Sequence, residues 1–158
     1  MSVKYILYNP LSCNGKGTEL AKKLTEIYKD DELKYCNMTQ ISGYGTFFDS
    51  ISSESDIVLC GGDGTLNRFI NDSDGYPYEN PLYYYGTGSG NDFLRDLGKE
   101  QGCEPVRINE YVRNLPIVTV NGKSSRFINA IGYGIDGYCC EKGDELREKA
   151  DKLYIYCG

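Results

Sequence analysis

The sequence contains no histidine and no tryptophan among its 158 residues. The lack of histidine excludes a Ser-His-Asp triad, a Cys-His pair and a histidine-ligated metal within this chain. A general base in this chain is therefore expected to be a carboxylate. A metal ion would be held by oxygen ligands, which suits Mg²⁺.

Long apolar runs are also missing, because no stretch approaches the ~20 residues that a membrane-spanning helix needs. The apolar stretch near the N-terminus is too short for a signal peptide and is interrupted by Asn9-Pro10. The seven cysteines form no C-x-x-C pair, so reduced thiols in the cytoplasm are expected rather than a zinc site or a disulfide framework. The net charge of −6 argues against nonspecific binding to nucleic acid.

Short apolar runs that lead into glycine-rich loops are, in contrast, frequent. Ile57 to Cys60 is followed by the turn GGDGT at 61–65, after which Leu66, Phe69 and Ile70 recur at helical spacing. The same order of strand, loop and helix is expected three times, with strands at 3–8, 57–60 and 81–85 and loops at 9–17, 61–65 and 86–92. A helix from Thr18, its expected cap, to about Tyr28 and a weak second strand at 33–36 are also expected. The sequence therefore predicts an α/β fold with a parallel sheet.

After about residue 102 the pattern changes to one typical of antiparallel strands. Asn121-Gly122 is a strong hairpin signal between predicted strands at 117–120 and 125–131, and a charged helix is predicted at 141–152. We therefore expect an α/β domain at 1–102 and the beginning of a β-rich domain at 103–158. Because one hairpin does not close a sheet, either the chain is a fragment or its β edges pair with another chain, as in a homo-oligomer.

The three loops are expected to gather at the carboxyl edge of the sheet, where α/β folds bind ligands. Glycines let the backbone approach a phosphate, and a helix N-terminus offers N–H groups to it. Asp63 by itself would repel a phosphate. Its presence in this loop is explained if a Mg²⁺ lies between the carboxylate and the phosphate, or if the carboxylate removes a proton from an attacking hydroxyl. An Asp-Gly turn is the plainer alternative for Asp63, and a helix cap for Asp92. Thr65 is expected to cap the following helix.

Three segments resemble the catalytic domain of the diacylglycerol kinase and sphingosine kinase superfamily, most closely its soluble bacterial branch. They are NPLSCNGKG at Asn9 to Gly17, GGDGTLN at Gly61 to Asn67 and GSGNDFLRDLG at Gly88 to Gly98. A fourth segment, GYGIDG at Gly132 to Gly137, is similar to the glycine–aspartate loop of the family's β domain. Arg68 stands where the family usually shows Glu, and Gly86 where a Pro often precedes the turn.

The resemblance implies a NAD-kinase-like nucleotide-binding domain, followed by the beginning of an antiparallel, lipid-binding β domain. It implies an ATP- and Mg²⁺-dependent lipid kinase, cytoplasmic and peripheral to the membrane, that phosphorylates diacylglycerol or a related lipid. Asp63 would be the catalytic residue and a metal ligand, and Asp92 a second metal ligand. The residues implied to contact nucleotide are Asn9, Ser12, Gly61, Gly62, Gly64, Thr65, Gly88, Ser89, Gly90 and Asn91.

Two other functions remain open at this point. The GGDGT element is shared with NAD kinases and phosphofructokinases, although the Asn-Glu-Asp pattern with which NAD kinases bind their acceptor is not evident here. Family members are also longer than this chain, so much of the lipid pocket is expected to lie outside it. A non-catalytic nucleotide-binding fragment is therefore the second alternative.

Overall fold

The computed structural model describes residues 2–74, 76–77, 79–131 and 142. The chain divides into two compact units, 1–128 and 129–158, and the elements named below belong to the first. The predicted loop at Gly132 to Gly137 lies outside the described residues, as does the predicted helix at 141–152 apart from Lys142.

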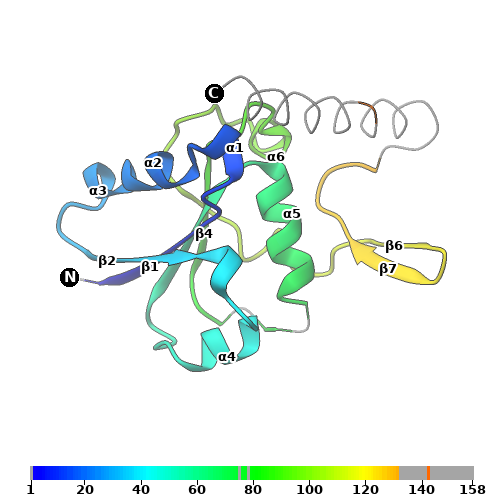
Figure 1. The fold of residues 1–158 in the computed structure, drawn as a ribbon, viewed down its shortest axis with the longest axis horizontal. Helices are drawn as coiled ribbons and strands as arrows, with labels where there is room; N and C mark the ends of the chain where they lie inside the picture. The colour runs from blue at the N-terminus through cyan, green and yellow to red at the C-terminus, as the bar shows by residue number, and fades with distance from the viewer. Residues whose placement is uncertain (1, 75, 78, 132–141, 143–158) are drawn as a thin grey trace, which may run out of the picture. The chain divides into compact units, whose positions relative to one another are not determined.

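Five strands form one sheet in the order β2-β1-β3-β4-β5 (Figure 1). Strands β1 to β4 are parallel, and β5 pairs antiparallel with β4. The strands are β1 (Val3–Tyr8), β2 (Glu32–Asn37), β3 (Asp56–Gly61), β4 (Leu82–Gly86) and β5 (Val106–Arg107). The predicted parallel α/β sheet is confirmed.

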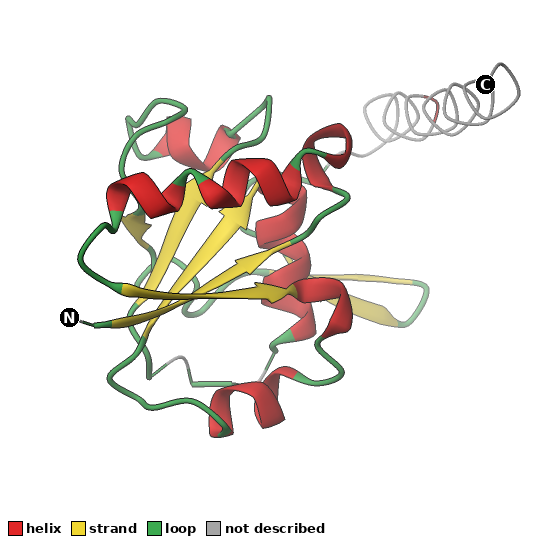
Figure 2. Ribbon diagram, turned by 60° about the vertical axis from the view of Figure 1, so that its left-hand side comes forward, coloured by secondary structure: helices red, strands yellow, loops and turns green. Residues whose placement is uncertain are grey.

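Helices cover both faces of this sheet (Figure 2). They are α1 (Ser12–Gly15), α2 (Gly17–Lys22), α3 (Leu24–Ile27), the 3₁₀ helix η1 (Met38–Gln40), α4 (Tyr44–Asp49), α5 (Asp63–Asp72) and α6 (Asp92–Asp96). On one face Val58 packs with Ala21 and Leu24, whereas Leu59 on the other face packs with residues of α4, α5 and α6. Because both faces are buried, the inner strands are mostly apolar rather than alternating, apart from Lys4 and Asp56 at their amino ends.

A two-stranded hairpin, β6 (Ile117–Val120) and β7 (Lys123–Arg126), follows the five-stranded sheet. Its turn, Asn121-Gly122, has φ angles of 51° and 76°, as a type I′ turn requires. This confirms the predicted hairpin, although the return strand runs from Lys123 to Arg126 rather than from Ser125 to Ile131. The domain boundary predicted after residue 102 stays a prediction, and β5 beyond it belongs to the five-stranded sheet. Among the helices described, none combines the length and apolar character needed to cross a bilayer.

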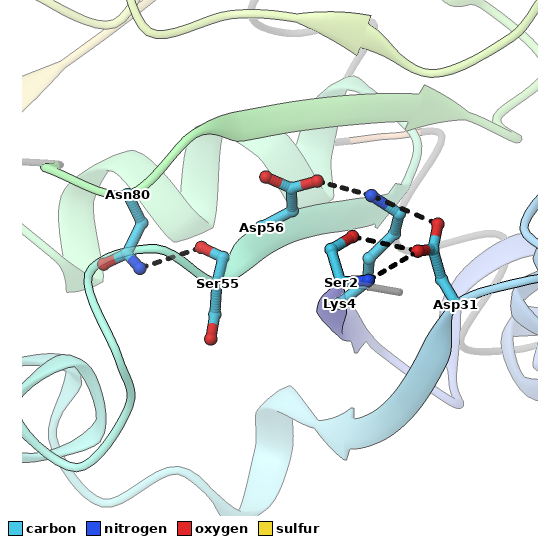
Figure 3. A network of polar contacts seen from close by, with 6 residues as sticks. All are labelled: Ser2, Lys4, Asp31, Ser55, Asp56 and Asn80. Carbon is cyan, nitrogen blue, oxygen red and sulfur yellow. Dashed lines mark hydrogen bonds and ion pairs between the residues drawn. The ribbon is translucent and has the colours of Figure 1, made fainter.

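A buried cation joins three segments at the amino edge of the sheet (Figure 3). Lys4 of β1 is 8% exposed, and its Nζ donates to Asp56 of β3 and lies 3.5 Å from Oδ2 of Asp31. Burial lowers the pKa of Lys4, but the hydrogen bond and charge of Asp56 and the charge of Asp31 outweigh it, so the net shift is upward. The backbone N–H of Ser2 donates to Asp31 at 2.8 Å and lowers the pKa of that carboxyl. The cluster therefore links β1, β3 and the turn before β2.

We expect Lys4→Met to lower the free energy of unfolding by about 2 kcal/mol, because Asp31 and Asp56 would then face each other without a cation. The matched control is Lys34→Met: the ion pair of Lys34 with Glu32 is half exposed, so its loss should change stability far less than the loss of Lys4. Urea unfolding at pH 7 measures both. Since the folded-state pKa of Lys4 lies above 10.5, its contribution is complete below that pH and is lost as the pH rises through the folded value. Equal losses in the two variants would contradict the structural role of Lys4.

Candidate functional site

Three loops meet at the carboxyl edge of the sheet. They follow β1, β3 and β4, which are neighbours in the strand order. The N–H of Thr87 donates to the carbonyl of Gly61 at 2.8 Å, which extends the pairing of β3 and β4 into their loops. The thiol of Cys13, in the loop after β1, donates to the carbonyl of Thr87 at 3.2 Å. The three loops singled out from the sequence are therefore in contact.

The loops after β3 and β4 touch backbone to backbone. A Cβ placed on Gly88 would lie 2.7 Å from Cα of Gly62, and a Cβ on Gly62 would lie 3.1 Å from Cα of Gly88. Real Cβ atoms essentially never approach other heavy atoms closer than 3.0 Å. Glycine is thus needed at Gly88 because of this close approach rather than because of its own backbone angles.

Asp63 connects the same two loops through its side chain. Its Oδ2 accepts the N–H of Asp92 at 3.1 Å, and its Oδ1 accepts the N–H of Phe93 at 3.1 Å. These are the first two N–H groups of α6, whose own N-cap residue, Asn91, makes no side-chain cap and has a φ of 51°. The carboxylate therefore caps a helix that follows it by some thirty residues along the chain. Asp63 is the first residue of α5 rather than part of an Asp-Gly turn, and its side chain makes a tertiary link to α6.

The oxygens of Asp63 and Asp92 border one small space beside Gly90. A Cβ on Gly90 would lie 3.4 Å from Oδ2 of Asp63 and 3.8 Å from Oδ2 of Asp92. Oδ1 of Asp92 accepts from Nη1 of Arg95 at 3.0 Å. Within the described residues, no group of three or more cysteines, aspartates or glutamates could hold a metal by itself. Two carboxylates match the share that a protein usually supplies to a Mg²⁺ ion bound together with phosphates.

Asn91 is 4% exposed, and its side chain lies beside Gly86 and Gly88 of the third loop. Its Nδ2 donates to the carbonyl of Gly88, whereas no donor among the described residues reaches its Oδ1. That oxygen would lie 3.2 Å from a Cβ on either Gly86 or Gly88. The side chain therefore fixes the shape of the loop and leaves one buried acceptor there.

A pocket of about 230 Å³ opens beside α5, and we refer to it as the α5 pocket. It is lined by Asn9, Ser12, Met38, Thr39, Gly64, Thr65 and Arg68. Four of these residues were among those predicted to contact nucleotide. The remaining predicted residues, Gly61, Gly62, Gly88, Ser89, Gly90 and Asn91, do not line it. Their role in binding stays a prediction.

Met38 and Thr39 were missed because the second strand was predicted to end at Cys36. Strand β2 continues to Asn37, so these two residues stand directly after its carboxyl end. The side chain of Asn37 accepts the N–H of Thr39 at 2.9 Å and starts η1. An asparagine that follows a predicted parallel strand by one residue is the signal that would have located them.

The prediction that Thr65 caps its helix is wrong. Helix α5 already begins at Asp63, its N-cap is Gly62, and no side chain caps it. Thr65 lies in the first turn, is 8% exposed, and donates its N–H to the carbonyl of Gly62 at 2.9 Å. Its side chain occupies the space that a Cβ on Gly61 would need. The residue thus packs the strand end against the helix and borders the α5 pocket.

Asn9 organises the loop after β1. Its Oδ1 accepts the N–H of Leu11 at 3.0 Å, and its carbonyl accepts both the N–H and the hydroxyl of Ser12, at 3.1 and 2.7 Å. Gly17 lies so close to that carbonyl that a Cβ would overlap it. The loop therefore has one tightly specified conformation.

The predicted single helix from Thr18 to about Tyr28 is instead α2 followed by α3, and Lys16 rather than Thr18 is the N-cap of α2.

The chemistry of the site follows from these groups. Burial raises the pKa of the Cys60 thiol to about 12, so Cys60 is not a nucleophile at neutral pH. The groups left to do chemistry at this site are the carboxylates of Asp63 and Asp92, the N–H groups in the first turn of α5 and the backbone of the glycine loops. Such groups suit binding and positioning of phosphates and a hard cation more than covalent catalysis.

Residues 4–120 match the family model described as the diacylglycerol kinase catalytic domain. A comparison with curated proteins finds no similar sequence. The matched region runs from β1 to the end of β6 and contains all three loops together with the residues of the α5 pocket. Because the match covers well over half of the chain, the chain belongs to the diacylglycerol kinase catalytic domain family, a family of kinases.

Proposed function

We propose that this chain carries the nucleotide-binding part of an ATP- and Mg²⁺-dependent lipid kinase that phosphorylates the hydroxyl of diacylglycerol or a related lipid. The observation that supports it most is the position of Asp63. This chain belongs to a kinase family, and the carboxylate of its Asp63 lies where two glycine loops touch, held by two backbone N–H groups. That arrangement orients an acid at the edge of the sheet where α/β folds bind ligands.

In this proposal the nucleotide is bound by Asn9, Ser12, Gly64 and Thr65 in the α5 pocket, and its phosphates approach the backbone of Gly61–Gly62 and Gly88–Asn91. The first turn of α5 favours an anion through its N–H groups and its dipole. Neither Gly62 nor Gly88 carries a side chain, and both are partly exposed. A phosphate can approach such a backbone closely.

Asp63 and Asp92 would hold the Mg²⁺, and their oxygen chemistry and shared space beside Gly90 fit that ion. When bound, the ion would neutralise charge on the phosphate oxygens. Asp63 is held in orientation by the N–H groups of Asp92 and Phe93, so it needs little rearrangement to act. Asp63 would also serve as the base that accepts the proton of the lipid hydroxyl.

In this proposal, different parts of the chain bind the nucleotide and the lipid. Residues 1–102 would bind the nucleotide, and residues 103–158 would begin the lipid-binding part. The lipid substrate lies in a bilayer, so we propose that the protein works in the cytoplasm at the membrane surface. The β6–β7 hairpin has two unpaired edges in the described structure, and self-association through such edges is part of the proposal.

Two measurements test this function. Thermal unfolding with and without Mg²⁺ and ATP should show a higher melting temperature with both, by about 2.7 kcal/mol of added stability at a ligand concentration a hundred times Kd. Incubation with radiolabelled ATP and vesicles containing diacylglycerol should label the lipid. Transfer to NAD instead would favour the NAD kinase alternative, and binding without transfer would favour a non-catalytic nucleotide-binding fragment. An unchanged melting temperature would contradict nucleotide binding.

A further inference from the structure

Helix α5 contributes an arginine to the α5 pocket. Gly64, Thr65 and Arg68 all line it, and their spacing places them on one face of the helix. Among the described residues that line the pocket, Arg68 alone carries a charge. Resemblance to the family does not account for this charge, because Glu usually stands at the position of Arg68.

The present partner of Arg68 holds it only weakly. Its Nε lies 3.2 Å from Oδ2 of Asp72, one turn further along α5, and the two side chains are 60% and 47% exposed. An exposed pair at this spacing contributes little to stability and exchanges readily with other partners. The two terminal nitrogens of Arg68 have no partner within the described residues. They can therefore form a bidentate contact with an oxyanion without breaking a buried interaction.

The negative charge around the pocket would weaken the binding of an anionic ligand, so a contact with a cation would strengthen that binding. The chain has a net charge of −6, and Asp63 and Asp92 stand at the same edge of the sheet. A nucleotide that approaches this edge meets repulsion from those carboxylates. The amino end of α5 and the guanidinium of Arg68 oppose that repulsion from the pocket side.

We propose that Arg68 binds a phosphate group of the nucleotide held at the α5 pocket, exchanging its ion pair with Asp72 for a charge-assisted contact with that phosphate. This inference rests on the proposed function, because it assigns a recognition role within the same nucleotide site. It makes Arg68 a specificity-determining residue that favours nucleotides over nucleosides.

The test compares ATP with adenosine by calorimetry, each with the unaltered chain and with Arg68→Gln. We expect Arg68→Gln to weaken ATP binding about tenfold and to leave adenosine binding within about twofold, since only ATP carries phosphate. Arg68→Lys should lie between, because lysine keeps the charge but loses the bidentate geometry. Asp72→Asn, which releases Arg68, should leave ATP binding equal or slightly tighter. Lys22→Gln removes a positive charge from an exposed site on α2 and should leave both affinities unchanged.

The outcomes separate this inference from the proposed function. If the unaltered chain binds neither ATP nor adenosine, the proposed function fails and the inference with it. If the unaltered chain binds ATP and Arg68→Gln binds it equally well, only the inference is overturned, and Arg68 is a solvated surface residue. Equal losses for ATP and adenosine would also overturn it, because they would indicate a contact with the nucleoside or an altered fold. Urea unfolding of Arg68→Gln distinguishes those last two causes.

Discussion

Asp63→Asn is expected to reduce phosphoryl transfer by about a thousandfold and to lower the free energy of unfolding by about 2 kcal/mol. The two effects have different origins. The loss of transfer follows from the proposed role of the carboxylate in holding Mg²⁺ and accepting a proton. The loss of stability follows from the hydrogen bonds that the carboxylate makes in the structure described here.

Those hydrogen bonds explain why asparagine is a poor substitute for Asp63 in the fold. One carboxylate oxygen accepts the N–H of Asp92 and the other accepts the N–H of Phe93. A side-chain amide offers one acceptor oxygen, so its NH₂ group would face the second N–H and leave it without an acceptor. The substitution also removes a negative charge from the amino end of α6. The capping of α6 is therefore expected to weaken even though the side chain keeps its size.

Urea unfolding measures the change in stability, and label transfer to diacylglycerol measures the change in activity. The matched control is Asp96→Asn, which alters the same residue type at the exposed last position of α6. It should change stability by less than about 0.5 kcal/mol and leave transfer unaltered. Full transfer activity in Asp63→Asn would remove Asp63 from the reaction. A stability loss together with full activity would leave only the capping role.

The part of the site that the sequence could predict is the part built from neighbouring residues. A buried parallel strand is apolar on both faces, so Ile57–Cys60 and the glycine turn after it are visible within one window. Parallel strands end at one edge, so the meeting of the three loops followed from the fold class. The resemblance to the kinase family singled out Asn9, Ser12, Gly64 and Thr65 within those loops, and these four residues line one pocket.

What the sequence could not predict depends on contacts between distant residues. No local pattern indicates that Asp63 caps α6, because Phe93 comes thirty residues later. Threonine is a residue type common at N-caps, but α5 begins two residues before Thr65, whose side chain packs against Gly61 instead of capping the helix. Strand β2 is only partly buried and thus has a weak apolar signal, so its end and the adjacent Met38–Thr39 were missed. Burial patterns fix elements, whereas caps and pocket walls depend on how elements meet.

Gly88→Ala is expected to lower the free energy of unfolding by about 3 kcal/mol and to weaken nucleotide binding more than tenfold. The added methyl group would lie 2.7 Å from Cα of Gly62 and 3.2 Å from Oδ1 of Asn91. The nearer atom belongs to the backbone, which cannot turn aside as a flexible side chain can. Gly88 does not have a left-handed backbone conformation, so the cost comes from overlap and not from the φ angle of alanine.

The overlap acts on the site as well as on stability. Moving Gly88 away from Gly62 separates the loops after β3 and β4, and the bonds from Asp63 to Asp92 and Phe93 span that separation. Hydrogen exchange at the N–H groups of Asp92 and Phe93 should therefore become faster in Gly88→Ala. Gly45→Ala is the control: a Cβ at this position in the first turn of α4 meets nothing within 4 Å, so this change should leave stability equal or raise it by up to about 1 kcal/mol. If Gly88→Ala kept full stability and slow exchange at both N–H groups, the close contact of the two glycines would not be what holds the loops together.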